Sequence, residues 1–213
     1  MMTTQSNTAL TDLNLEETPN HSSPSSRQLD ILKAALNCFI HQGIEATTIE
    51  MIREQSGASV GSIYHHFGNK EKIAAALYKE GLRQFSHQLQ QSLKHATHLE
   101  DAIRRIIQAN IDWIVTQPDW ARFVFRHRRV LKDADQERAF REEITSSHRV
   151  FLSQLEVLPD FKRLRALPQA MYLPVLIGPV HTYARQWLDD QTLPSPHDLN
   201  EDFIQIALKS LLN

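Results

Sequence analysis

Five consecutive residues have the types and spacing needed for hydrolytic chemistry. Residues 57–61 read Gly-Ala-Ser-Val-Gly, which fits the G-x-S-x-G pattern of serine hydrolases. That pattern exposes a nucleophilic serine only where a strand turns sharply into a helix, with histidine and acidic partners behind it. Here the segment follows an amphipathic helical pattern, and the chain has no alternating strand pattern of useful length. We therefore expect the two glycines to serve a turn and close packing, and we predict no enzyme activity.

Three histidines are the second candidate for chemistry. His87, His95 and His98 share one face of a predicted helix, at spacings of eight and three residues. Imidazoles at helical spacing can share a metal ion. However, His87 points away from the apolar side of that helix, and no cysteine or carboxylate completes an obvious set of ligands. We interpret this region as a solvated face and expect neither a metal nor a cofactor.

The elements around residues 57–61 are predicted to be two short helices joined by a tight turn. A threonine at 47 or 48 can cap the first helix, and Gly57 can end it in the left-handed conformation. Ser59 can cap the second helix, in which Ile63 and Phe67 lie one turn apart and point inward. The other side chains of the second helix are mostly hydroxyls and imidazoles, which suit a polar surface. This layout predicts a helix-turn-helix.

Over roughly residues 29–82 the chain resembles the TetR family of bacterial transcriptional regulators. The resemblance lies in Thr47-Thr48, Gly57-Ala58-Ser59, Tyr64-His65-His66-Phe67 and Lys70-Glu71, which follow the family's order and spacing. Beyond this region only the layout of helices is similar. Together with the helical periodicity, the resemblance implies an all-α fold of about nine helices. It has an N-terminal three-helix head with the helix-turn-helix, and a C-terminal helical bundle for ligand binding and dimerisation.

The resemblance also implies that the second helix of the motif enters a DNA major groove. Val60 departs from the polar residue often found at its position; it can touch a thymine methyl but cannot make a bidentate base contact. The helix contains no Arg or Asn to read bases, so we expect DNA shape and phosphate contacts to contribute more than direct readout. The predicted DNA-binding residues are Thr47, Thr48, Ser59, Val60, Gly61, Ser62, Tyr64, His65, His66 and Lys70.

Composition separates a polar tail from a helical remainder. We predict a disordered tail at residues 1–26, a DNA-binding domain at 27–72, and an effector-binding and dimerisation domain at 73–213. The tail carries three acids and no Lys or Arg, so the remaining chain has a net charge of +1 within a total of −2. DNA affinity must therefore come from local charge. No apolar run approaches the roughly 20 residues that cross a bilayer, and no secretory signal is apparent, so we expect a cytoplasmic protein.

The predicted body carries polar groups on otherwise apolar helix faces. Asn110 and His148 each interrupt an apolar stripe, where they either meet a ligand or are satisfied by neighbouring groups. Most of the candidate pocket residues would be core residues if no ligand binds. The candidate effector pocket comprises Asn110, Trp113, Phe123, His148, Phe151, Tyr172, His181, Tyr183 and Trp187.

The most basic short region contains Arg122, Arg126, Arg128 and Arg129. It could hold an acidic effector or partner. The alternative, which we favour, is a solvated face paired with the acids at 133, 135 and 137.

Taken with the resemblance, these features predict a homodimeric regulator, usually a repressor in this family, that binds double-stranded DNA at a palindromic operator. Half-sites would lie about 34–36 Å apart, and a small organic effector would release the protein. The resemblance places dimerisation on residues 168–188 and 198–212. The alternative is a DNA-associated helical interaction protein without a small effector. A large apolar pocket would favour the effector-controlled regulator, and a filled body would favour the alternative.

Overall fold

The computed structural model describes residues 24–131 and 134–213. These ranges contain nine α-helices and two short 3-10 helices, and their only β-type pairing is an isolated bridge between Leu164 and Leu212. The predicted all-α fold of about nine helices is confirmed. Most of the predicted tail lies outside the described residues.

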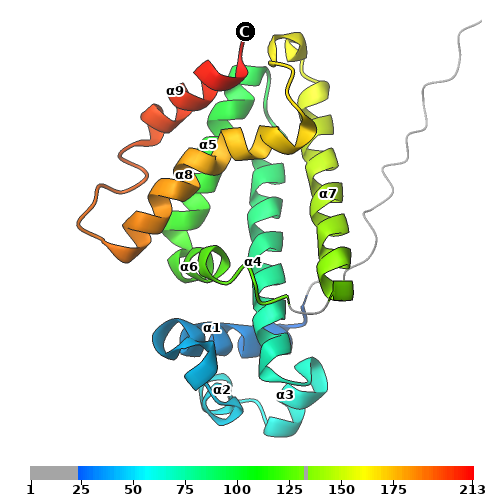
Figure 1. Ribbon diagram of the computed structural model, residues 1–213, viewed down its shortest axis with the longest axis vertical. Helices are drawn as coiled ribbons and strands as arrows, with labels where there is room; N and C mark the ends of the chain where they lie inside the picture. Colours follow the sequence, from blue (N-terminus) through cyan, green and yellow to red (C-terminus); the bar gives the residue numbers. More distant parts are fainter. Residues whose placement is uncertain (1–23, 132–133) are drawn as a thin grey trace, which may run out of the picture.

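Four helices build the head at one end of the molecule (Figure 1). They are α1 (Ser26–Ala46), α2 (Ile49–Ser56), α3 (Val60–Phe67) and the first turns of α4 (Lys70–Leu93). Each contributes an isoleucine that is almost completely buried, namely Ile31, Ile52, Ile63 and Ile73. Because α4 continues from the head into the body, it connects the two parts directly.

Caps and turns fix the helix ends in the head. Thr48 caps α2 by accepting a hydrogen bond from the backbone N–H of Met51, and Ser59 caps α3 through the N–H of Ser62. Gly57 ends α2 with φ 61° and ψ 14°, the left-handed conformation that glycine adopts without strain. Gly43, with φ 79° and ψ 159°, interrupts the helical conformation of α1, and a last helical turn after this kink ends at Ala46.

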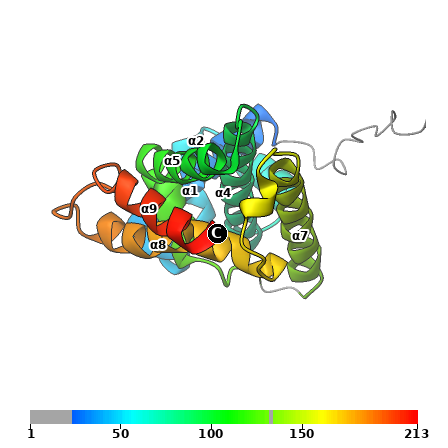
Figure 2. The ribbon, with the colours of Figure 1, turned by 90° about the horizontal axis from the view of Figure 1, so that it is seen from above.

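The body contains α5 (Leu99–Thr116), α6 (Pro118–Arg126), α7 (Ala134–Glu156), α8 (Tyr172–Asp189) and α9 (Asn200–Leu211). The 3-10 helices, Phe161–Arg163 and Gln169–Met171, lie between α7 and α8. Seen from above, α5, α8 and α9 gather on one side of α4, and α7 lies on the other (Figure 2).

Two helix starts in the body differ from the sequence prediction. The helix predicted from residue 168 begins at Tyr172 and accommodates Pro179 in its interior. Within the predicted range 198–212, the last helix begins at Asn200, and the Asp198 carboxylate before it accepts a hydrogen bond from the N–H of Ser195.

Helices α4 and α6 pack unusually closely at Gly81. A Cβ atom at this position would lie 2.6 Å from Val124 Cγ2 and 3.2 Å from Trp120 Cε3. We expect Gly81→Ala to destabilise the protein by about 1–3 kcal/mol through overpacking, which outweighs alanine's advantage of about 1 kcal/mol in helix propensity. Urea unfolding measures the difference.

A matched control for this substitution is available in α8. A Cβ atom at Gly178 would meet no atom within 4 Å, so Gly178→Ala should leave stability unchanged or raise it by up to about 1 kcal/mol. Equal effects of the two substitutions would contradict the close α4–α6 contact.

Candidate nucleic-acid interface and ligand cavity

Helix α3 presents a polar surface at the free end of the head, away from the body (Figure 1). Val60 is 37% exposed and Tyr64 is 51% exposed, although both are large and partly apolar. Ser59, Gly61 and His65 are also exposed, whereas Ser62 and His66 are partly buried. With Thr48, which is exposed just before α2, and Lys70, which is partly buried at the start of α4, nine of the ten predicted DNA-binding residues have surface available for contact.

The side chains of Thr47 and Lys70 both bind carbonyl groups near the C-terminal end of α1. Thr47 is only 1% exposed, and its hydroxyl donates a hydrogen bond to the carbonyl of Gly43 at 2.8 Å. The Lys70 ammonium donates to the carbonyls of Glu45 and Thr47, each at 2.8 Å. The buried Thr47 side chain corrects the expectation of a contact with phosphate or a base edge. Both residues support the head by satisfying carbonyls at the end of α1.

Two further polar contacts, which the sequence analysis missed, position the motif. Arg27 Nη2 donates to the carbonyl of Gly57 at 2.9 Å, and Asn37 Nδ2 donates to Gln55 Oε1 at 2.8 Å. Both contacts connect α1 to α2 or to the turn that follows it. No local sequence pattern reveals them, because the partners are 30 and 18 residues apart.

A cavity of about 740 Å³ lies in the body between α4, α6, α7 and α8. Its size is within the roughly 300–1,000 Å³ typical of small-molecule sites. Of the nine predicted pocket residues, His148, Phe151 and His181 line it. Asn110 lies behind the wall, where its Oδ1 is 3.0 Å from Nε2 of His181. The other six of the nine predicted pocket residues do not line this cavity.

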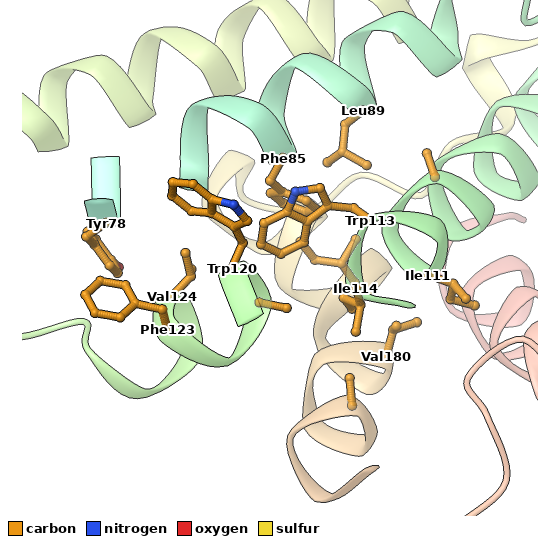
Figure 3. Close-up of a cluster of buried hydrophobic side chains, with 14 of the residues drawn as sticks. Tyr78, Phe85, Leu89, Ile111, Trp113, Ile114, Trp120, Phe123, Val124 and Val180 are labelled. Carbon is orange, nitrogen blue, oxygen red and sulfur yellow. The ribbon is translucent and has the colours of Figure 1, made fainter. Parts of the chain in front are cut away.

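The remaining predicted pocket residues pack elsewhere, which corrects the sequence-based set. Trp113 is 2% exposed and packs against Phe85 with ring centroids 5.2 Å apart (Figure 3). Phe123 is completely buried and stacks on Phe39 of the head at 6.0 Å. These two rings belong to the core.

The last three predicted pocket residues that do not line the cavity form hydrogen bonds or pack near the ends of α8. The Tyr172 hydroxyl donates to the carbonyl of Arg165 at 3.1 Å, and the Tyr183 hydroxyl donates to that of Pro194 at 2.7 Å. Trp187 is buried, and its carbonyl accepts a hydrogen bond from Gln191 at 2.6 Å. Helical periodicity places these residues on apolar faces but does not say which face borders an empty space.

The charged residues that line the cavity are Arg128, Arg141 and Arg185, with no Asp or Glu among the lining residues that are described. Arg141 forms an ion pair with Glu137 at 2.7 Å. The guanidinium of Arg185 lies over the ring of Phe125, 5.4 Å from its centroid. All three arginines are exposed, so they form a cationic rim around an apolar interior.

The basic region predicted from the sequence divides into two parts. Arg122 forms an ion pair with Asp119 at 2.9 Å and donates to the carbonyl of Leu188, and Arg126 pairs with Asp189. These two arginines are therefore paired, though with other acids than those predicted; residue 133 and the side chain of residue 135 lie outside the described set. The other two arginines of the region line cavities.

Burial keeps the two cavity histidines uncharged at neutral pH. Burial, and to a smaller extent the nearby Arg185 charge, lower the pKa of His181 to about 4. Burial also lowers the pKa of His148. The histidine rings therefore act as neutral hydrogen-bonding groups, and the arginines supply the charge of the cavity.

His181 should make stability depend on pH. Its imidazole stays neutral in the folded protein down to about pH 4, whereas in the unfolded chain it binds a proton below its ordinary pKa of 6.5. The unfolded state then binds more protons between these values, so the free energy of unfolding falls as pH is lowered from 6.5 towards 4. We expect a loss on the order of 2–3 kcal/mol over this window. Urea unfolding at several pH values measures it.

The matched variant for this prediction is His181→Gln, which cannot titrate. Its pH profile between 6.5 and 4 should be flatter than that of the wild-type protein. Parallel profiles would show that His181 is not the titrating group.

The three histidines considered as metal ligands are exposed. Nδ1 of His98 accepts a hydrogen bond from the N–H of Asp101 at 3.1 Å and so caps α5. In the described part of the chain, no group of three or more His, Cys, Asp or Glu residues is arranged to hold a metal ion. No described helix is both long enough and apolar enough to cross a membrane.

Comparisons with known proteins agree with this architecture. Residues 31–77 match the family model for bacterial regulatory proteins of the tetR family. The repressor AcnR of Corynebacterium efficiens is 42% identical over 57 residues, which are 27% of this chain and 30% of that protein. The chain thus spans less than a third of that relative's length.

Two solved structures cover nearly the whole chain. The fatty acid degradation regulator FadR from Bacillus halodurans superposes with a TM-score of 0.73 at 15% identity, covering 88% of this chain and 97% of that one. FadR from Bacillus subtilis, solved in complex with stearoyl-CoA, gives a TM-score of 0.67 at 17% identity, covering 84% and 96%. At these identities the likeness establishes the fold alone.

A helix-turn-helix head on an all-helical body is the architecture that this chain shares with these regulators. The likeness to the tetR family is thus one of sequence in the head and of fold over most of the chain.

Proposed function

We propose that this protein is a homodimeric, sequence-specific DNA-binding repressor of the cytoplasm, released from a palindromic operator by a small organic effector. The single observation that carries the proposal is the exposed face of α3, on which Val60 and Tyr64 stand out from the head while Ile63 anchors the helix inside. The second helix of a helix-turn-helix, when it exposes one face and is anchored by the other, can lie in the DNA major groove. Related proteins named as repressors support repression as the sign of regulation.

The proposed interface divides into base-facing and backbone-facing residues. Val60, Gly61 and Ser62, at the start of α3, would face base edges, with His65 adding a contact. The remaining exposed side chains would meet phosphate or sugar. They are Thr48, Ser59 and Tyr64, together with the partly buried His66.

A dimer supplies the specificity that one short helix lacks. Two heads would read half-sites about 34–36 Å apart. We assign the contact between protomers to α8 and α9, where Ile206 is 46% exposed despite its large apolar side chain. The 73–213 region would thus bind the effector and dimerise, and the 27–72 region would bind DNA.

Helix α6 is suited to couple the cavity to the head. Val124 and Phe125 line the cavity, while the neighbouring Phe123 stacks on Phe39 of α1. A ligand that moves α6 would therefore move the head. For this to weaken DNA binding, the ligand must bind the DNA-incompetent arrangement more tightly. The cavity also favours effector control over the alternative of an interaction protein with a filled body.

Selection of genomic fragments by the purified protein tests the proposal. Fragments from the source genome are recovered at two salt concentrations with wild-type protein and with Tyr64→Ala. One inverted repeat, recovered by the wild type and lost with the variant, is the expected result. Fragments without a common sequence, with binding that only fades as salt rises, would instead identify a non-specific DNA-associated protein.

A further inference from the structure

We propose that the effector is a lipophilic anion, with an elongated apolar body held inside the cavity and an acidic head group bound at the rim by Arg128 and Arg141. This inference names the ligand class of the regulator proposed above and rests on that proposal only for the link to DNA. It joins three observations: the lining of the cavity, the sign of its charge, and a second cavity that shares one of its walls.

The interior accepts an apolar body. Each of the four surrounding helices contributes apolar or aromatic side chains, namely Phe85 on α4, Phe125 on α6, Phe151 on α7 and Ile177 on α8, beside polar ones such as Ser86, Gln90, Thr145, Ser147 and Thr182. Phe125 and Phe85 also enclose the ring of His181, with centroids 4.8 and 5.6 Å from it. A ligand covered by these groups gains from burial of apolar surface.

The charge of the rim selects an acidic head group. Three arginines line the cavity and no acid does, among the residues described. Within the described ranges, neither Arg128 nor Arg185 forms an ion pair with a carboxylate. A carboxylate or phosphate would supply that partner and could bind a guanidinium through two hydrogen bonds. The positive charge of the arginines would repel a cationic ligand. A neutral ligand would leave that charge without a counter-charge.

The head group is placed at Arg128 and Arg141 by the geometry of the two cavities. A second cavity of about 1180 Å³ lies between the head and the body, and it shares Tyr78, Arg128, Phe140 and Arg141 with the first. Its own charged lining adds the bases Lys70, Arg126 and Arg129 and the acids Glu45, Glu71 and Glu137, so bases outnumber acids in the whole lining. A carboxylate would stay at the shared wall, whereas a larger phosphate-bearing head group would extend into the second cavity.

The same position explains how the head group would reach the DNA-binding domain. Arg128 follows directly after α6, whose Phe123 packs on Phe39. The second cavity is also lined by Ile44 of α1 and by Lys70, which binds carbonyls at the end of α1. An anion that extends from the shared wall into the second cavity would therefore lie between the body and the base of the head.

Three probes of equal chain length test the preference for an anion. Binding of dodecanoate, dodecanol and dodecyltrimethylammonium to the full chain is measured by calorimetry below their aggregation limits. We expect dodecanoate to bind about ten- to a hundredfold more tightly than dodecanol, as charge-assisted hydrogen bonds imply, and the cation to bind weakest. Equal affinities, or no binding of dodecanoate, would overturn the proposal.

Variants test the two arginines. Arg128→Gln together with Arg141→Gln should bring dodecanoate binding down to that of dodecanol. Arg149→Gln is the matched control, because Arg149 is an exposed arginine on the same helix as Arg141 and does not line either cavity. Unchanged dodecanoate affinity in the double variant would remove these residues from the site.

Two further experiments complete the test. One distinguishes a carboxylate head group from a phosphate-bearing one, and the other distinguishes failure of the ligand class from failure of the proposed regulator. If the head group carries phosphates, dodecanoyl-CoA should bind more tightly than dodecanoate and lose this advantage in Arg129→Gln; if dodecanoate binds as tightly, the head group is the carboxylate. Selection of genomic fragments is run in parallel without ligand. An operator recovered without any preference for anions would overturn the ligand class alone. Dodecanoate binding without an operator would overturn the regulator while leaving the ligand class standing.

Discussion

Replacing Val60 with glutamate should reduce operator affinity by at least about a hundredfold, because a like charge placed against an anionic partner costs several kcal/mol. Val60 is the first residue of α3, is 37% exposed, and stands where the proposed interface meets base edges. The new carboxylate would face the phosphates of the groove. Fluorescence anisotropy with the selected operator measures the change.

The fold should tolerate this substitution. A carboxylate in the first turn of a helix is favourable to the helix dipole, so the thermal midpoint should not fall. Val157→Glu is the matched control: it makes the same change at an 81% exposed valine beyond the end of α7, at the opposite end of the molecule from the head (Figure 1). If Val157→Glu weakens operator binding as much as Val60→Glu, the effect is one of net charge and the α3 interface is wrong.

Replacing Phe123 with alanine should lower the free energy of unfolding by about 3–5 kcal/mol, since it removes a fully enclosed aromatic ring. Phe123 has no exposed surface and packs between Phe39 at 6.0 Å and His127 at 4.6 Å. The loss would take up a large part of the roughly 5–15 kcal/mol that stabilises a typical domain. Denaturant unfolding monitored by circular dichroism measures it.

Phe125→Ala provides the comparison on the same helix. Phe125 is only partly buried and borders the cavity, so its removal should cost clearly less stability than that of Phe123. Equal losses from the two substitutions would contradict the assignment of Phe123 to the packing between head and body and of Phe125 to the cavity wall.

The head was largely predictable from the sequence because its signals are local. Caps act three residues away, Gly57 requires only its own φ angle, and Ile63 follows from helical periodicity. The roles of Thr47 and Lys70 were missed for the opposite reason. Their partners are carbonyls at the end of a different helix, up to 25 residues away for Lys70, and no spacing rule anticipates that meeting.

The cavity was predictable only in its general chemistry. Trp113 and His181 both lie on apolar helix faces, yet one fills the core and the other lines an open space. The difference depends on how α4, α5 and α8 pack together, which periodicity does not encode. Arg141 and Arg185 look like ordinary surface arginines in the sequence, and they become a rim only because α7 and α8 face the same cavity.

The hydrogen bonds made by Arg27, Asn37, Thr47 and Lys70 join the pieces of the head into one rigid unit. For the proposed dimer, a bound effector would then displace each head without reshaping α3. The base sequence preferred within a half-site should stay the same, while the preferred number of base pairs between half-sites should change. In a library of operators whose half-sites are shifted in steps of one base pair, about 3.4 Å each, the effector-bound protein should select a different spacer length with unaltered half-sites. The effector would thus release the protein from its operator by changing the distance between the two heads, and not by changing the bases that each head reads.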